Sequence, residues 1–235
     1  MKILAIETST MLGGVAIADD SAGLIAEVRL NVKSTHSERL MTEIDHVLKQ
    51  SFLKISDIDV FAIAVGPGSF TGLRIGLSTV KGLSYATGKP IVSVPTLEAF
   101  AWNFPYCRYP VCTLLDARKK EVYAAVFRWE DSGFVRLIDE VSISVDSLLG
   151  KAGFPDEKIL FAGEGAILYK NEITELMGDG ALFASHEKMS PLPANVASLG
   201  LKKASQEDFS EPVSLVPFYI RSSEAEVKLN KKCNV

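Results

Sequence analysis

The chain has 235 residues, of which 47% are hydrophobic and 23% are charged, and its formal net charge is −4. This length suffices for one large domain or two small ones, each with a core of its own. Phosphate neutralisation supplies most of the affinity of nucleic-acid-binding proteins, so an acidic chain is not expected to bind nucleic acid strongly by itself. Any such contact is expected to be made mainly by a partner.

The apolar run at the start of the chain is short, because Glu7 interrupts it. It is too short for a signal-peptide core or a membrane span. The three cysteines lack the spacing of metal ligands. We therefore expect a soluble cytoplasmic protein with no membrane segment.

The first half of the chain predicts three strands followed by alternating helices and strands. The strands are expected at residues 3–6, 14–18 and 24–32. From His36 the apolar residues recur at about 100° per residue, which indicates an amphipathic helix. An almost continuously apolar strand at 60–65, a helix at 71–87, a strand at 90–94 and a short helix from Thr96 complete the half.

The second half repeats this order. Strands are expected at 111–116, 122–128 and 134–141, and are followed by a helix at 145–149, a strand at 158–162, a helix at 166–177, a strand at 181–183 and a helix from Ala194. Glu7 and Asp116 end the corresponding first strands. The repeat favours an α/β fold of two ribonuclease-H-like lobes, each βββαβαβα, as in actin, sugar kinases and Hsp70. The alternative is two unrelated α/β domains that share an element order by chance.

The predicted domain division follows from this repeat. Residues 1–104 form the first lobe, and residues 105–221 form a smaller second lobe whose C-terminal segment can return to the first. Residues 222–235 are polar, with three lysines, and are expected to be a flexible tail.

A glycine-rich segment, Gly66-Pro-Gly-Ser-Phe-Thr-Gly-Leu-Arg-Ile-Gly76, joins a predicted strand to a predicted helix. Glycine permits a tight turn there, and Ser69 or Thr71 can cap the helix. Its amides could also hold an anion. The spacing matches neither a P-loop nor a Rossmann turn, so the pattern favours a structural turn over an anion site.

The same segment resembles the signature shared by the TsaB and TsaD families. Three other segments agree with it: the opening Ile3-Leu-Ala-Ile-Glu-Thr-Ser, His36-Ser-Glu-Arg-Leu, and Pro217-Phe-Tyr-Ile-Arg221 with Ala225-Glu226. The resemblance covers residues 1 to 226. It implies the actin-like fold and a role in building threonylcarbamoyladenosine into tRNA.

The two families differ in a metal site. TsaD carries a His-x-x-x-His pair after the strand that follows the signature, and the matching positions here are Thr96 and Phe100. Neither side chain replaces imidazole as a ligand of a transition metal. The chain therefore resembles TsaB, the non-catalytic relative of TsaD, with no metal site expected. The resemblance implies TsaD and the ATPase TsaE as partners, a homodimer when the protein is isolated, and contact with tRNA only indirectly.

A weak nucleotide site is the second expectation. Actin-like ATPases and sugar kinases place an acidic residue and hydroxyls around phosphate and magnesium at the first turn of each lobe. The matching residues, with the glycines of the adenosine-binding turn, are Glu7, Thr8, Ser9, Thr10, Asp116, Gly163 and Gly165. Glu164 interrupts the glycines, which favours weak or vestigial binding of ATP or ADP with magnesium, alone or in the complex, and no required cofactor. The basic run 118–120 is interpreted as a solvated hairpin turn, although it could clamp a phosphate.

The two helices of the first half are the predicted partner interface. The helix at 71–87 is apolar over about 220° of its circumference, whereas packing on a sheet needs only about 100°. Surplus apolar surface on adjacent helices predicts a subunit contact. The expected interface residues are Leu40, Met41, Ile44, Val47, Leu73, Gly76, Leu77 and Val80. The alternative is that this surplus is internal core.

Three functions compete at this point. The resemblance implies a scaffold subunit that binds TsaD and is required for threonylcarbamoyl transfer to the tRNA adenosine next to the anticodon, with no catalytic residues of its own. An autonomous small-molecule kinase would need intact phosphate and adenosine turns, of which only fragments are present. A peptidase, the activity once attached to the wider glycoprotease family, is disfavoured because the chain has no His-Glu-x-x-His motif.

Overall fold

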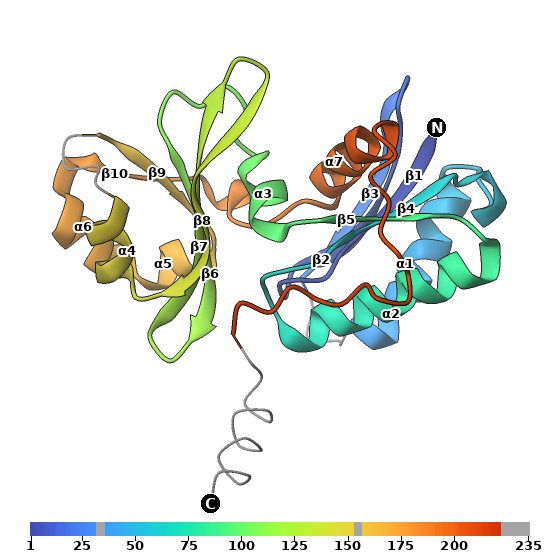
Figure 1. The fold of residues 1–235 in the computed structure, drawn as a ribbon, viewed down its shortest axis with the longest axis horizontal. Coiled ribbons are helices and arrows are strands. Elements are labelled where there is room, and N and C mark those ends of the chain that lie inside the picture. The colour runs from blue at the N-terminus through green and yellow to red at the C-terminus, as the bar shows by residue number, and fades with distance from the viewer. Residues whose placement is uncertain (32–35, 153–156, 222–235) are drawn as a thin grey trace, which may run out of the picture.

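A computed structural model describes residues 1–31, 36–152 and 157–221 of the chain. Figure 1 shows two α/β lobes, each built on one five-stranded mixed sheet. Three short 3₁₀ helices lie in the connections, η1 (Ile55–Asp57), η2 (Gly178–Gly180) and η3 (His186–Lys188). In this part of the chain, none of the helices has the length and apolar character needed to cross a membrane.

The first-lobe sheet has the strand order β3-β2-β1-β4-β5. Its strands are β1 (Lys2–Glu7), β2 (Gly13–Asp19), β3 (Gly23–Leu30), β4 (Val60–Ala64) and β5 (Ile91–Val94). β1 pairs antiparallel with β2 and parallel with β4. β1, β2 and β4 are almost entirely buried, as expected for strands that are covered on both faces.

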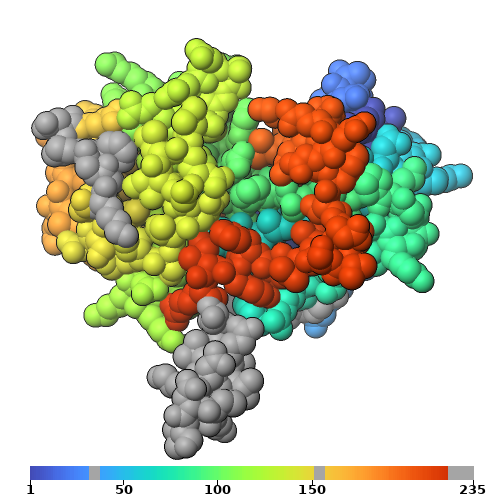
Figure 2. All heavy atoms as spheres, viewed as in Figure 1, coloured from blue at the N-terminus to red at the C-terminus, as the bar shows by residue number. Residues whose placement is uncertain are grey.

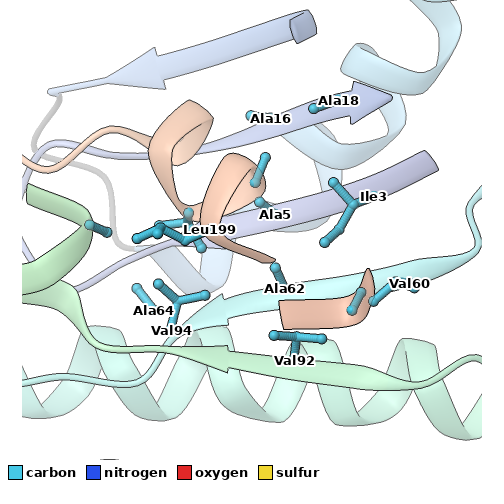
Figure 3. Packing of buried hydrophobic residues seen from close by; sticks show 14 residues of the cluster. Ile3, Ala5, Ala16, Ala18, Val60, Ala62, Ala64, Val92, Val94 and Leu199 are labelled. Atoms are coloured by element: carbon cyan, nitrogen blue, oxygen red, sulfur yellow. The ribbon is translucent and has the colours of Figure 1, made fainter. Parts of the chain in front are cut away.

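Helices from both ends of the chain cover this sheet. One face packs against α1 (His36–Gln50) and α2 (Phe70–Thr87). The other face packs against α7 (Pro193–Ser205), which returns from the end of the second half (Figure 1). Figure 3 shows Leu199 of α7 among small side chains of the sheet, including Ala5 and Ala62. These alanines allow α7 to approach the strands closely.

The second-lobe sheet repeats the first, with the order β10-β9-β6-β7-β8. Its strands are β6 (Val111–Arg118), β7 (Glu121–Glu130), β8 (Gly133–Ile143), β9 (Ile159–Ala162) and β10 (Ala181–Phe183). One face packs against α4 (Val145–Ala152), α5 (Glu164–Leu168) and α6 (Lys170–Met177). The other face packs against α3 (Thr96–Ala101), which follows β5. The prediction of two ribonuclease-H-like lobes is confirmed.

Most predicted elements are present within one or two residues, and two differ. The helix predicted at 166–177 is two helices, α5 and α6, which meet at Tyr169. The helix predicted at 145–149 continues to Ala152. The predicted flexible tail, 222–235, lies outside the described residues.

The predicted interface residues require a correction, because seven of the eight lie in the core of the single chain. Leu40 and Leu73 are each 2% exposed, whereas Met41 is 56% exposed. The remaining buried members of the set are Ile44, Val47, Gly76, Leu77 and Val80. These seven positions therefore pack within the monomer and present no surface to a partner.

These residues are buried because α2 packs against more elements than the periodicity of its sequence can reveal. Its apolar arc packs against β4 and α1, and also near Leu215 of the C-terminal segment. Gly76 has no room for a side chain, because an added Cβ would overlap Thr8 Oγ1 and lie 2.9 Å from Ile63 Cδ1. The surplus apolar surface is therefore used internally.

A charge at one of the buried positions should unfold the protein, whereas a charge at the adjacent exposed one should not. Leu40→Glu places an unpaired carboxylate in the core, and we expect it to lower the free energy of unfolding by at least about 3 kcal/mol. Met41→Glu should change it by less than about 0.5 kcal/mol. Urea denaturation followed by circular dichroism measures both. Equal stability of the two variants would contradict this placement of α1.

Candidate functional site between the lobes

A cleft of about 550 Å³ lies between the two lobes. Five segments contribute to it: the turn after β1, the start of α2, the end of β6 with its neighbour on β7, the start of α5, and the C-terminal segment. The lining residues are Ser9, Thr10, Met11, Gly68, Ser69, Phe70, Thr71, Leu115, Asp116, Ala117, Arg118, Tyr123, Glu164, Tyr219 and Arg221. The repeat of the two halves thus brings the ends of β1 and β6 to one place.

Glu7 ends β1 beneath the floor of this cleft. It is fully buried, and its Oε1 accepts a hydrogen bond of 2.5 Å from Ser9 N. Its Oε2 has no hydrogen-bond partner among the described residues. Burial raises the pKa of Glu7 to about 7, because the ionised carboxylate loses its hydration. Glu7 is therefore a partly protonated core residue that does not line the cleft.

The hydroxyl residues after Glu7 mainly hold the turn against α2. Thr8 Oγ1 donates a hydrogen bond of 2.8 Å to Gly72 O. Ser9 O accepts one of 2.6 Å from Ser69 N. Ser9 and Thr10 line the cleft, whereas Thr8 does not. Ser9 Oγ is buried and has no hydrogen-bond partner within the described part of the chain.

Asp116 meets these residues from the second lobe. Its carboxylate accepts a hydrogen bond of 2.8 Å from Arg118 N and lies 3.3 Å from Arg118 Nη1. Asp116 N donates to Glu164 Oε1 at 3.3 Å. The carboxylates of Asp116 and Glu164 therefore lie on the same wall of the cleft, and that of Asp116 is paired with the Arg118 guanidinium.

Gly163 and Gly165, the predicted adenosine-binding glycines, do not line the cleft. At Gly163 an added Cβ would overlap Leu114 O and lie 3.0 Å from Phe100 Cε1. At Gly165 it would lie 3.0 Å from Leu114 Cβ. Both glycines let α5 pack closely against β6. The nucleotide role expected for these two positions stays a prediction.

The cleft suits a nucleotide only in part. Hydroxyls of Ser9 and Thr10 and the carboxylate of Asp116 are ligands of the kind that hydrated magnesium prefers. No glycine turn opens on the second lobe to receive adenosine, and Glu164 stands where the turn would begin. The described residues do not fit ATP bound in the manner of actin-like ATPases.

The sequence analysis missed the C-terminal segment 217–221, here called the strap, as part of the site. Phe218 N donates to Val65 O at 2.7 Å, which attaches the strap to the first lobe. Arg221 Nη1 donates to Ala117 O and to Glu121 Oε2, both at 3.3 Å, which attaches it to the second. Its aromatic and arginine residues were visible in the sequence, but nothing local placed them across the cleft.

Thr96 and Phe100, at the positions of the TsaD histidine pair, have structural roles. Thr96 Oγ1 accepts a hydrogen bond of 3.1 Å from Gly66 N, and Thr96 N donates to Gly66 O at 2.9 Å. Phe100 is fully buried between α3 and the second-lobe sheet. Among the residues that the structure describes, no group of three or more histidine, cysteine, aspartate or glutamate side chains is placed to hold a metal ion.

Comparison with known proteins decides the family. The model of TsaD, described as tRNA N6-adenosine threonylcarbamoyltransferase, matches residues 24–229. The tRNA threonylcarbamoyladenosine biosynthesis protein TsaB of Bacillus subtilis is 29% identical over 97% of both chains. The chain belongs to the TsaB branch of this family. The transferase of Kosmotoga olearia is 37% identical, but that match covers only 49% of this chain and 40% of the transferase.

A solved structure supports the same fold. An uncharacterized protein of Pseudomonas aeruginosa, described as similar to the peptidase YeaZ, superposes with a TM-score of 0.81. It covers 94% of this chain and 99% of its own, at 24% identity. The TsaB fold is therefore shared over nearly the whole length of both proteins.

The buried carboxyl group of Glu7 predicts a pH dependence of stability. Its pKa of about 7 lies above the ordinary value of 4.5, so the folded protein binds more protons between these values. The free energy of unfolding should fall as pH rises from roughly 5 to 8, by up to about 3 kcal/mol from this group.

Glu7→Gln should remove this part of the pH dependence of the free energy of unfolding, because an amide does not ionise. Urea denaturation at several pH values measures it for wild type and variant. Asp45→Asn is the control, because that carboxylate is exposed and pairs with Lys49 at 2.7 Å on the surface. An unchanged pH slope in Glu7→Gln would show that Glu7 is ionised throughout.

Proposed function

We propose that this chain is a non-catalytic cytoplasmic subunit that binds TsaD, and TsaE through it. In this role it supports transfer of threonylcarbamoyl to the tRNA adenosine next to the anticodon. The observation that carries the proposal is at Thr96 and Phe100. These positions match the histidine pair of TsaD, and here both side chains are fully buried in packing roles.

The cleft supports the same interpretation. Glu7 is fully buried and does not line the cleft, and Asp116 is paired with Arg118. The glycines that would open an adenosine site pack against β6. An autonomous kinase would need an accessible carboxylate base together with that site. The fold of an ATP-handling superfamily is therefore retained here for its shape.

We place the docking surface for TsaD on the outward side of α1 and α2. Gly82 of α2 is exposed, and an added Cβ would meet nothing within 4 Å. A glycine inside a helix destabilises it by roughly 0.5–1 kcal/mol relative to alanine, and no contact within the described residues requires one here. Close approach of a partner's backbone would explain why this position is a glycine.

Exposed apolar side chains accompany Gly82 on these two helices. Tyr85 is 94% exposed on α2, and Met41 is exposed on α1. Rigid aromatic and flexible methionine side chains are typical of binding surfaces. A second copy of the chain would use the same surface in a homodimer when TsaD is absent.

A reconstituted assay tests the function. TsaD, TsaE, tRNA and threonylcarbamoyl-adenylate should yield modified adenosine at a useful rate only when this chain is added. Modification at the same rate without the chain would contradict the proposed role.

Gly82→Trp tests the surface, because its indole would hold a partner's backbone away. We expect an unchanged melt and at least about tenfold weaker binding to TsaD, or roughly 1.4 kcal/mol. Gly82→Ala should raise the free energy of unfolding by about 0.5 kcal/mol. Gly150→Trp is the matched control, since Gly150 is also an exposed helical glycine with open space around it, but on α4. Equal binding of TsaD by both tryptophan variants would place the docking surface elsewhere.

A further inference from the structure

The turn between β6 and β7 is formed by three basic residues in an unfavourable backbone conformation. Arg118, Lys119 and Lys120 have φ values of 65°, 53° and 64°. This left-handed region disfavours residues with a side chain, and two-residue hairpin turns of this kind prefer Asn-Gly. A turn that keeps basic side chains against the preference of its backbone indicates that the charges themselves have a use.

Arg118 lines the inter-lobe cleft, and Lys119 and Lys120 follow it in the turn. All three residues are exposed, and the Arg118 side chain is 86% exposed. Arg221 of the strap lies beside them, since it donates to Ala117 O and Glu121 Oε2. Figure 1 shows this turn near the end of the described chain. Together, Arg118–Lys120 and Arg221 are here called the basic tip.

Carboxylates pair with the two arginines of the basic tip. Asp116 pairs with Arg118 at 3.3 Å, and Glu121 pairs with Arg221 at 3.3 Å. These pairs hold the two guanidinium groups in place at the rim. Glu164 lies inside the cleft, where it would repel a phosphate. A bound polyanion is therefore expected to follow the rim and to leave its phosphates outside.

Aromatic side chains line the same cleft as Arg118 and Arg221. The rings of Phe70 and Tyr219 stack with their centroids 5.0 Å apart. The Arg74 guanidinium lies 3.8 Å from the centroid of Phe70, and its Nε donates to the Tyr219 hydroxyl at 2.9 Å. Tyr123 also lines the cleft. Rings held in this way are suited to stack against an unpaired base.

We propose that this edge of the cleft binds single-stranded RNA, with phosphates on the basic tip and an unpaired base against the aromatic side chains. Exposed cations beside stacking rings are the usual means of holding single-stranded nucleic acid. The proposal builds on the tRNA role above and adds a direct contact to it. With a net charge of −4 on the chain, this contact supplements the affinity that the partner supplies.

The test replaces Lys119 by Asn and Lys120 by Gly in the full chain. This double variant removes two charges and relaxes the turn, so it should melt no lower than wild type. Fluorescence anisotropy with a labelled anticodon stem–loop RNA measures binding over a range of salt. The negative slope of log affinity against log salt should become shallower by about 1.4 when two phosphate contacts are lost. Binding should weaken roughly twentyfold near 0.1 M salt.

Two comparisons control this result. Lys202→Gln with Lys203→Gln removes the same charge from α7, outside the cleft, and should bind the stem–loop nearly as wild type does. A fully paired RNA of the same length should bind wild type more weakly than the stem–loop. Equal binding by wild type and the Asn-Gly variant would overturn the proposal, as would equal binding of paired RNA.

Binding of TsaD separates this inference from the proposed function. The Asn-Gly variant should bind TsaD normally and should require more tRNA for half-maximal modification. If the variant no longer binds TsaD but still binds RNA as wild type does, the basic tip contacts an acidic protein surface and the assignment of an RNA site is wrong. If wild type fails to support modification but the RNA results hold, the proposed function fails and the RNA site stands.

Discussion

The sheet of the first lobe is apolar on both faces, and the segments that follow its strands directly cover only one of them. α1 and α2 take that face, while Ile3, Ala5 and Ala62 on the other face are covered by α7, which follows the second lobe. Burying this face requires the chain to complete the second lobe and then return. The relative position of the two lobes is therefore set by the core.

The return has consequences for the cleft. From α7 the chain continues along β5, where Ser210 N donates to Ile91 O at 2.8 Å, and then crosses as the strap. The strap bonds to both lobes through Phe218 and Arg221. Enzymes that close on substrates need lobes that separate, whereas these contacts tie the lobes together. A cleft held in this way suits a subunit that presents a fixed surface to partners.

Much of the fold could be predicted because strand and helix periods are local properties. The repeat of element order in the two halves also predicted that Glu7 and Asp116 end corresponding strands.

The orientation of helix residues could not be predicted in the same way. Leu77 belongs to a core cluster against which Leu215 packs, more than a hundred residues later in the chain, and no periodicity reports that contact. The packing of Gly163 could not be predicted for a similar reason, since the backbone that an added side chain would meet there belongs to β6. The basic run 118–120 was visible in the sequence, but its positive φ angles and its position beside Arg221 are features of the folded chain.

The central claim is that two carboxylates, Glu7 buried beneath the cleft and Asp116 in its wall, take no part in the chemistry of threonylcarbamoyl transfer. The most direct measurement is the rate of tRNA modification by TsaD and TsaE with a double variant of this chain, Glu7→Gln with Asp116→Asn, at saturating concentration of the complex. We predict a maximal rate within about twofold of wild type, a difference of roughly 0.4 kcal/mol in the barrier. A fall of a hundredfold or more, with the complex still formed, would show that this chain contributes catalytic groups.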